Sequence, residues 1–195
     1  TASFPAGTVD LAGIDTEKDG VIALTGAKAG VAREPDAVQW IGDDRFVTLF
    51  CYGSVAGGFL SERWLGAAKP DVMENRSLTK YGLIIEESGW DLFQALLACL
   101  GNIAKAHGSD IASVAGRWVL DQPGVAAVIV GARNRAHLAS NVQLSSLRLS
   151  AEENAAIDAI LAQSPGPQGD TYTLERDRTG RHGAIMKYNL NAGKA

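Results

Sequence analysis

The sequence holds few residues that could build a covalent or metal-held scaffold. It has two cysteines, Cys51 and Cys99, and each lies within apolar sequence. We expect no disulfide framework and no metal site, because a zinc site needs more ligands at short spacing. Two buried free thiols fit a reducing compartment, so we predict a cytoplasmic protein.

Long apolar runs and an excess of basic charge are missing as well. No stretch of about 18 uninterrupted apolar residues occurs and no signal pattern follows Thr1, so we expect no membrane span. The formal net charge is −4, which is not typical of a nucleic-acid-binding protein. One exception is the stretch 175–195, which is rich in Arg and Lys. Two interpretations of it stay open: a solvated tail, or a flap that meets an anionic ligand.

The composition that remains is typical of a globular domain. Of 195 residues, 46% are hydrophobic and 21% are charged, which is enough apolar content for a core. The length suits one domain, but it falls slightly short of a complete eight-stranded β/α barrel, which takes at least about 200 residues.

Short apolar runs predict strands. Residues 46–51 and 125–130 are typical of parallel strands that are buried on both faces. Residues 21–24 and 37–41 are weaker candidates. A long loop is expected over residues 66–90, which combine glycine, proline and mixed charges.

Two strong helices are predicted after that loop. Apolar positions recur every three or four residues over 92–104 and again over 111–119, which gives each helix one continuous apolar stripe. Gly108 ends the first helix, and Ser109 or Asp110 caps the second.

Two weaker helix signals follow the second predicted strand. One helix is expected over about 135–144, and another begins at Ser150, where Ser150 and Glu153 form a capping box. Strands that alternate with helices predict an α/β fold with parallel strands.

Both predicted strands run into segments suited to anion binding. The segment 51–63 contains three glycines after its strand, which let backbone N–H groups approach a phosphate, and Ser54, Ser61 and Arg63 would add hydrogen bonds. After the second strand, Arg133 and Arg135 lie near a helix N-terminus, which favours negative charge. The alternatives are a plain turn with structural glycines and ordinary solvated arginines.

Five motifs resemble the C-terminal part of the aldo-keto reductase superfamily, in the family's order, from about residue 47 to 161. They are YGSVAGGFLSERWL (52–65), SVAGRWVL (113–120), VIVGAR (128–133), LASN (138–141) and LSAEE (149–153). The resemblance implies an eight-stranded β/α barrel that binds NADP(H) and reduces aldehydes or ketones. It also implies that residues 46–51 are the seventh barrel strand and residues 125–130 the eighth.

The resemblance further implies which residues hold the cofactor. The loop after the seventh strand would lie along the pyrophosphate, with Gly53, Ser54, Val55, Gly58, Leu60, Ser61 and Arg63. The loop and helix after the eighth strand would hold the adenosine 2′-phosphate and the adenine, with Gly131, Ala132, Arg133, His137, Ser140 and Asn141. Arg133 favours NADP over NAD, since an Arg accommodates the extra phosphate. His137 and Ser140 depart from the family, in which many members have Gln and Glu at these positions.

The catalytic half of the family pattern has no counterpart here. The family uses an Asp, Tyr, Lys and His before the seventh strand, but residues 1–45 contain no Tyr and no His. Six strand-helix units do not fit into that segment when each crossover takes at least about 10–12 residues. We assign no catalytic residue, although His182, Lys187 and Tyr188 in the tail have the residue types of a proton donor and its neighbours.

The sequence therefore predicts a partial (β/α)8 TIM-barrel-like α/β fold that is incomplete at the N-terminal side. Its parts are an atypical segment 1–45, an aldo-keto-reductase-like part 46–163 and a C-terminal tail 164–195. Trp64, Trp90 and Phe93 are expected to pack in the core rather than to line a substrate pocket. Two strands alone would expose an apolar sheet, so we expect a homo-oligomer or a partner chain.

Three hypotheses of function stay open. The first is an NADP(H)-dependent oxidoreductase of small carbonyl substrates that is truncated or lacks the usual catalytic Tyr and His. The second is a non-catalytic NADP(H)-binding or scaffold protein that needs a partner chain. The third is a fragment of such a reductase.

Overall fold

The computed structural model describes residues 39–40, 46–47, 49–131, 135, 137–167 and 171–186. The predicted strand at 21–24 lies outside these residues. Of the predicted strand at 37–41, the structure describes β1 (Gln39–Trp40), which pairs antiparallel with β2 (Phe46–Val47).

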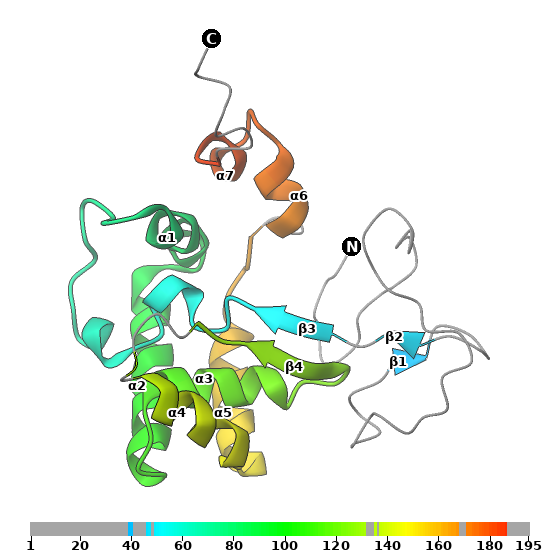
Figure 1. The fold of residues 1–195 in the computed structure, drawn as a ribbon. Helices are drawn as coiled ribbons and strands as arrows, with labels where there is room; N and C mark the ends of the chain where they lie inside the picture. The colour runs from blue at the N-terminus through cyan, green and yellow to red at the C-terminus, as the bar shows by residue number, and fades with distance from the viewer. Residues whose placement is uncertain are drawn as a thin grey trace.

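The central feature of the fold is a pair of parallel strands, β3 (Leu49–Tyr52) and β4 (Val125–Ile129), which lie side by side in Figure 1. Their register places Tyr52 opposite Ile129. The prediction of parallel strands is confirmed. The predicted strand 46–51 is divided between β2 and β3.

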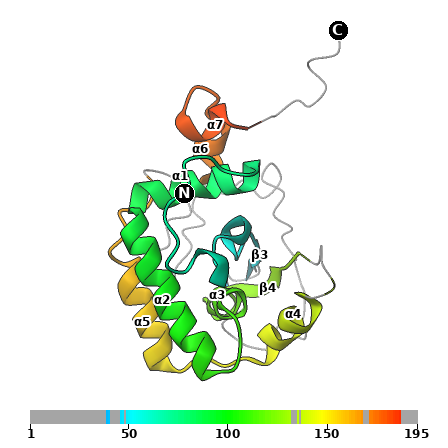
Figure 2. The same ribbon diagram turned by 90° about the vertical axis from the view of Figure 1, so that its left-hand side faces the viewer.

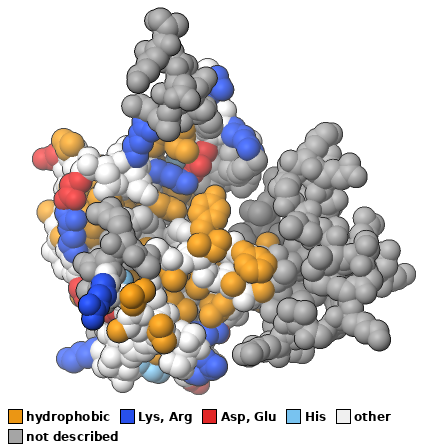
Figure 3. Space-filling view, in the orientation of Figure 1, with side chains coloured by type: hydrophobic (Ala, Val, Ile, Leu, Met, Phe, Trp, Pro, Cys, Tyr) orange, Lys and Arg blue, Asp and Glu red, His pale blue; other side chains and the backbone are white. Residues whose placement is uncertain are grey.

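One face of this sheet is open, so the prediction of strands buried on both faces is wrong. Phe50 and Tyr52 are 62% and 72% exposed, and Ile129 is 57% exposed. Strand alternation and the register place these three side chains on the same face, where hydrophobic side chains gather near the centre of Figure 3. The physical reason is that the described helices pack on one side of the sheet, with α3 (Ile111–Leu120) against β4.

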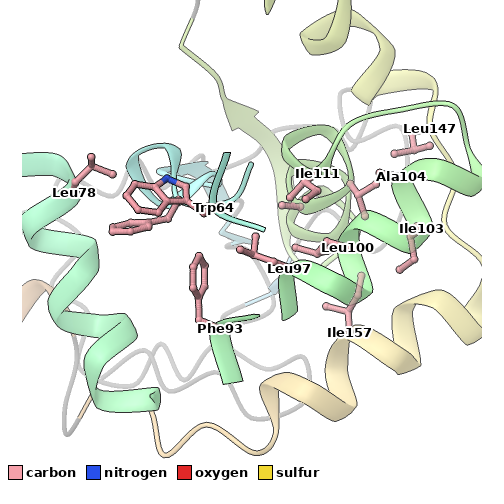
Figure 4. Packing of buried hydrophobic residues seen from close by; sticks show 13 residues of the cluster. Trp64, Leu78, Phe93, Leu97, Leu100, Ile103, Ala104, Ile111, Leu147 and Ile157 are labelled. Carbon is pink, nitrogen blue, oxygen red and sulfur yellow. The ribbon is translucent and has the colours of Figure 1, made fainter. Parts of the chain in front are cut away.

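The core lies among three helices, α2 (Trp90–Ala106), α3 and α5 (Ala151–Leu161), and extends to Phe59 and Trp64 in the chain that follows β3. The predicted stripe of α3 is confirmed. That of α2 is confirmed in part, because Leu100, Ile103 and Ala104 are buried, but Ala95 is exposed and the buried Phe93 and Leu97 lie outside the predicted stripe. The cluster in Figure 4 includes Leu97, Leu100, Ile111 and Ile157. Burying such side chains stabilises the fold by roughly 1.5–3 kcal/mol each. The helices α2 and α5 run side by side in Figure 2.

The helix starts follow the predicted caps. The Asp110 side chain accepts a hydrogen bond of 2.7 Å from the Ser113 N–H, which fixes the start of α3. Ser150 and Glu153 form the predicted capping box of α5. The helix α4 (His137–Ser146) follows β4 where a helix was predicted, and Leu144 is its buried residue.

The helix α1 (Arg76–Ser88) occupies the region that was predicted to be a long loop, so that prediction is wrong. Its N-cap is Asn75, which accepts a hydrogen bond from the Leu78 N–H at 3.0 Å. A helical pattern is present in the sequence, because Leu78, Tyr81 and Ile85 recur at helical spacing and all three pack in or against the core. The prediction overlooked it because many polar and charged residues surround them.

Two short C-terminal helices, α6 (Thr171–Arg176) and α7 (Arg181–Ala184), pack against α1 and lie above it in Figures 1 and 2. Ion pairs join them to α1: Lys80 to Glu175 at 2.7 Å, His182 to Glu87 at 2.6 Å, and Arg181 to Glu86. We call residues 171–186 the C-terminal segment. This part of the tail is docked rather than solvated, and the anionic groups that it meets include carboxylates of α1.

Both cysteines are free thiols and are half-buried rather than fully buried. Burial raises the pKa of Cys51 and of Cys99, so both thiols stay protonated and unreactive near neutral pH.

Candidate functional site

Two loops leave the sheet at the same end. Because β3 and β4 are parallel and Tyr52 lies opposite Ile129, the chain after each strand emerges at the carboxyl end of the sheet. Ligands of α/β folds bind at this end of the strands. We call residues 53–65 the glycine loop and residues 130–137 the second loop. The predicted cofactor residues Ala132 and Arg133 lie outside the described residues.

The glycine loop is a tight turn with left-handed backbone angles. Gly53, Gly57 and Gly58 have φ values of +73°, +66° and +106°, which glycine adopts without the steric cost of a Cβ atom. The Ala56 N–H donates to the Gly53 carbonyl at 2.8 Å. The Ser61 hydroxyl donates to the Gly58 carbonyl at 2.8 Å. These bonds close the loop on itself, so its shape is set before any ligand arrives.

Several backbone N–H groups of this loop have no backbone acceptor among the described residues. They include those of Ser54 and Val55, which follow each other directly after the left-handed Gly53. Successive N–H groups in a turn are a common arrangement for binding an anion. An anion at this turn would accept hydrogen bonds from these N–H groups.

The helix α1 approaches the glycine loop through Tyr81. A Cβ atom on Gly53 would lie 2.1 Å from the Tyr81 Oη, and one on Gly57 would lie 2.9 Å from the Tyr81 Cδ2. Both positions favour glycine because of their positive φ angles, and a side chain at either one would also displace the Tyr81 ring. Burial raises the pKa of Tyr81, which the charge of Lys80 only partly opposes, so the phenol keeps its proton at neutral pH.

An aromatic cluster anchors the glycine loop to the core through Phe59 and Trp64. Phe59 is fully buried, and its ring centroid lies 4.8 Å from that of Trp64 and 5.7 Å from that of Phe93. Trp90 completes the cluster, and its indole N–H donates to the Ala67 carbonyl at 3.1 Å. The prediction of core packing is confirmed for Trp64 and Phe93, whereas Trp90 is half-buried and packs against the core. Aromatic pairs in such tilted and edge-to-face arrangements stabilise the packing beneath the loop by more than their buried area alone would give.

The charged residues of the glycine loop have partners within the chain. Arg63 pairs with Glu74 and lies over the Trp64 ring, 4.9 Å from its centroid. This pairing holds the pKa of Glu74 below its usual range. The Glu62 carboxylate accepts a hydrogen bond of 2.7 Å from the Ile111 N–H, at the start of α3. Glu62 therefore ties the loop to the core, whereas Arg63 keeps an exposed guanidinium at its rim.

Gly131, the residue that follows Val130 at the end of β4, has one polar contact with α4: the Asn141 side chain donates to its carbonyl at 3.2 Å. Within α4, the Ser140 hydroxyl donates to the His137 carbonyl at 3.2 Å. The Ser140 carbonyl in turn accepts from the Ser113 hydroxyl at 3.3 Å. His137 is exposed at the first turn of α4. The structure thus gathers Gly131, His137, Ser140 and Asn141 around one helix start.

The three tail residues that have the residue types of a proton donor and its neighbours, His182, Lys187 and Tyr188, do not come together among the described residues. His182 is 7% exposed and is bound to Glu87 on α1, and Lys187 and Tyr188 lie outside the described residues. The residues that sequence reasoning missed are Lys80 and Tyr81. No local signal marks them, because their contacts come from the loop after β3 and from the C-terminal segment.

The described part of the chain has neither a metal-binding cluster nor a membrane-spanning helix. Within it, no group of three or more His, Cys, Asp or Glu side chains is arranged to hold a metal ion. No helix there has both the length and the apolar character that crossing a membrane would take.

Residues 41–162 match the sequence model of the Aldo/keto reductase family. The match covers more than half of the chain, and the protein belongs to the aldo/keto reductase family.

Individual relatives match over a shorter part. The chain is 32% identical over 114 residues to "Protein tas" of Escherichia coli (strain K12) and equally to "Protein tas" of Shigella flexneri, which covers 58% of this chain and 32% of each relative. The glycerol dehydrogenase AKR11B4 from Gluconobacter oxydans is a similar solved structure, with a TM-score of 0.48, 24% identity and coverage of 63% of this chain and 36% of that chain. The chain spans about a third of the length of the relatives it matches.

Proposed function

We propose that this chain forms the cofactor-holding part of an aldo-keto-reductase-like, NADP(H)-dependent oxidoreductase that acts on aldehydes or ketones. The observation that carries the proposal is the glycine loop, whose Ser54 and Val55 N–H groups lack backbone acceptors among the described residues at the carboxyl end of β3. Family membership makes a nicotinamide cofactor the fitting anion for this loop. In this proposal residues 46–163 are the reductase part, between an atypical segment 1–45 and a tail 164–195.

The glycine loop would hold the pyrophosphate. Backbone N–H groups bind the phosphate oxygens, and the exposed Arg63 guanidinium supplies positive charge from the rim. The Ser61 hydroxyl already donates to Gly58, so its main contribution is the shape of the loop. The residues assigned to this end are Gly53, Ser54, Val55, Gly58, Leu60, Ser61 and Arg63.

The second loop and the start of α4 would hold the adenosine end. The helix N-terminus favours negative charge, and Arg133 is the group assigned to the 2′-phosphate, which distinguishes NADP from NAD. Asn141 supports this end by holding the Gly131 carbonyl in place. The residues assigned here are Gly131, Ala132, Arg133, His137, Ser140 and Asn141.

Carbonyl reduction needs a hydride and a proton. The bound nicotinamide supplies the hydride, and the protein orients it and provides the proton donor. Residues 1–45 contain neither Tyr nor His, so we assign this chain no proton donor of its own.

A specific observation favours the alternative of a non-catalytic NADP(H)-binding or scaffold protein. The open sheet face exposes Phe50, Tyr52 and Ile129, and exposed apolar patches of this kind mark interaction sites. In this alternative a second copy or a partner chain covers that face. A homo-oligomer or a complex would then be the functional unit.

A fluorescence titration tests the proposal. NADPH should bind to the chain, and Arg133→Ala should weaken NADPH binding more than NADH binding. Turnover of a panel of aldehydes would support the reductase, whereas binding without turnover would support the alternative. No change in NADPH fluorescence or polarisation on adding the protein would remove the basis of both.

A further inference from the structure

The helix α1 has two neighbours that lie far apart in the sequence. It contacts the glycine loop on one side, through η2 (Ala56–Gly58), and the C-terminal segment on another. Figure 2 shows α6 and α7 above α1 and the strand ends below it. The helix therefore forms the physical link between the candidate phosphate loop and the C-terminal segment.

The contact with the glycine loop is made by the ring of Tyr81. Its Oη and Cδ2 atoms take the space that side chains at Gly53 and Gly57 would fill. The ring therefore packs directly against the turn and restricts its conformation. A displacement of Tyr81 by a fraction of an ångström would let the loop change shape, because packed contacts lose much of their attraction over such gaps.

The contact with the C-terminal segment is made by Lys80. Its Nζ atom lies 2.7 Å from Glu175 Oε1, and the two side chains are only 20% and 16% exposed. The same Nζ atom lies 5.2 Å from the centroid of the Tyr81 ring. Burial disfavours the charge of Lys80, but pairing with Glu175 outweighs it and the pKa of Lys80 is raised. Lys80 stays charged at neutral pH.

Two further pairs hold the segment on α1. His182, almost fully buried, is bound to Glu87, and Glu86 pairs with both Arg181 and Lys69. The segment is therefore also held by Arg181 and His182. Loss of the Lys80–Glu175 pair alone should loosen the segment around Glu175 without releasing it from α1.

We propose that the C-terminal segment is a positioning element for the glycine loop. Glu175 holds Lys80, and Lys80 holds the Tyr81 ring against Gly53 and Gly57, so that docking of the segment raises the affinity of the loop for its anionic ligand. This inference rests on the proposed cofactor function of the loop. By linkage, ligand binding must stabilise the docked segment by the same factor.

The experiment compares Glu175→Gln with Asp158→Asn. Both substitutions remove one carboxylate charge, but Asp158 lies on α5, where it accepts a hydrogen bond from Trp118, away from the C-terminal segment. Amide exchange of residues 53–61 and 171–186 is measured without ligand, and binding is measured with NADPH. We expect Glu175→Gln to speed exchange in both regions and to weaken NADPH about five- to tenfold, and Asp158→Asn to change neither.

Further variants separate positioning from general stability. Lys80→Arg keeps a cation that can pair with Glu175 and lie over the Tyr81 ring, so it should keep both the slow exchange and the affinity, whereas Lys80→Met should lose both. Tyr81→Phe keeps the ring and should keep most of the binding, whereas Tyr81→Leu should lose it.

The outcomes distinguish this inference from the function on which it rests. If the wild type binds no NADPH, the proposed function fails, and the exchange of residues 53–61 without ligand still decides whether the segment positions the loop. If the wild type binds NADPH while Glu175→Gln leaves both the exchange of residues 53–61 and the affinity unchanged, the inference is overturned and the proposed function stands.

Discussion

The two loops at the end of the sheet are supported in different ways. The glycine loop rests on Phe59, which is fully buried among aromatic rings, and on the ring of Tyr81. Of the second loop, the described Gly131 contacts α4 through the Asn141 side chain, and the buried residue of α4 is Leu144. A loop fixed by packing is preorganised for its ligand and does not lose conformational entropy on binding. In the proposed function, the better-packed end of the candidate site is therefore the one assigned to the pyrophosphate.

The largest expected effect comes from removing the support of the glycine loop. Phe59→Ala should lower the free energy of unfolding by about 3–5 kcal/mol, because it leaves a cavity among Trp64, Trp90 and Phe93. Urea unfolding measures the loss, and Val142→Ala on the exposed face of α4 is the control, with a change within about 0.5 kcal/mol. A loss for Phe59→Ala as small as that of the control would contradict the account of this loop.

The matching change at the second loop should be smaller. Leu144→Ala removes the buried anchor of α4 and should cost about 2–3 kcal/mol, near the lower end for a buried leucine, because the rest of α4 is largely exposed. Leu138→Ala, at an exposed position of the same helix, serves as the matched control in the same unfolding measurement. The comparison breaks down if Leu144→Ala destabilises the protein more than Phe59→Ala does.

An intermediate effect is expected where the glycine loop meets α3. Glu62→Ala removes the carboxylate that accepts from the Ile111 N–H and should cost about 1 kcal/mol, as the loss of a helix N-terminal acceptor does. Glu62→Gln keeps an acceptor oxygen and should lose less. Equal losses in the two variants would show that the hydrogen bond does not contribute.

The smallest effect concerns the rim of the loop and its pH dependence. Arg63 lowers the pKa of Glu74, so the pair is complete above the ordinary glutamate pKa and is lost only as the pH falls through the lowered value. Glu74→Gln should free Arg63 and raise the affinity for NADP+ a few-fold at most at neutral pH. In the wild type, the affinity for NADP+ should rise in this way only at acidic pH, where protonation of Glu74 releases Arg63. If Glu74→Gln instead lowers the affinity for NADP+, then Glu74 rather than Arg63 contacts the ligand, and this prediction is wrong.

Much of the fold follows from local patterns. The stripes of α2 and α3 and the caps at Asp110 and Ser150 depend on residues within one or two turns, so the sequence alone predicts them. The parallel pairing of β3 and β4 follows from the alternation of strands and helices. The glycines at 53, 57 and 58 also mark the turn, because their backbone angles require that residue type.

What could not be predicted depends on contacts between distant segments. The helix α1 contacts the glycine loop and the C-terminal segment, and neither contact is visible from the sequence of the helix itself. Tyr81 meets Gly53 across 28 residues of sequence, and Lys80 meets Glu175 across 95. The open face of the sheet was missed for a similar reason, because an apolar strand has the same sequence whether or not another layer covers it.

The most direct test of the central claim is amide hydrogen exchange at the glycine loop with and without NADPH. The account predicts that NADPH slows exchange at the Ser54 and Val55 N–H groups, which donate to no backbone carbonyl of the described residues. Under conditions where binding is established by titration, unchanged exchange at Ser54 and Val55 would contradict the claim that this loop holds the phosphates.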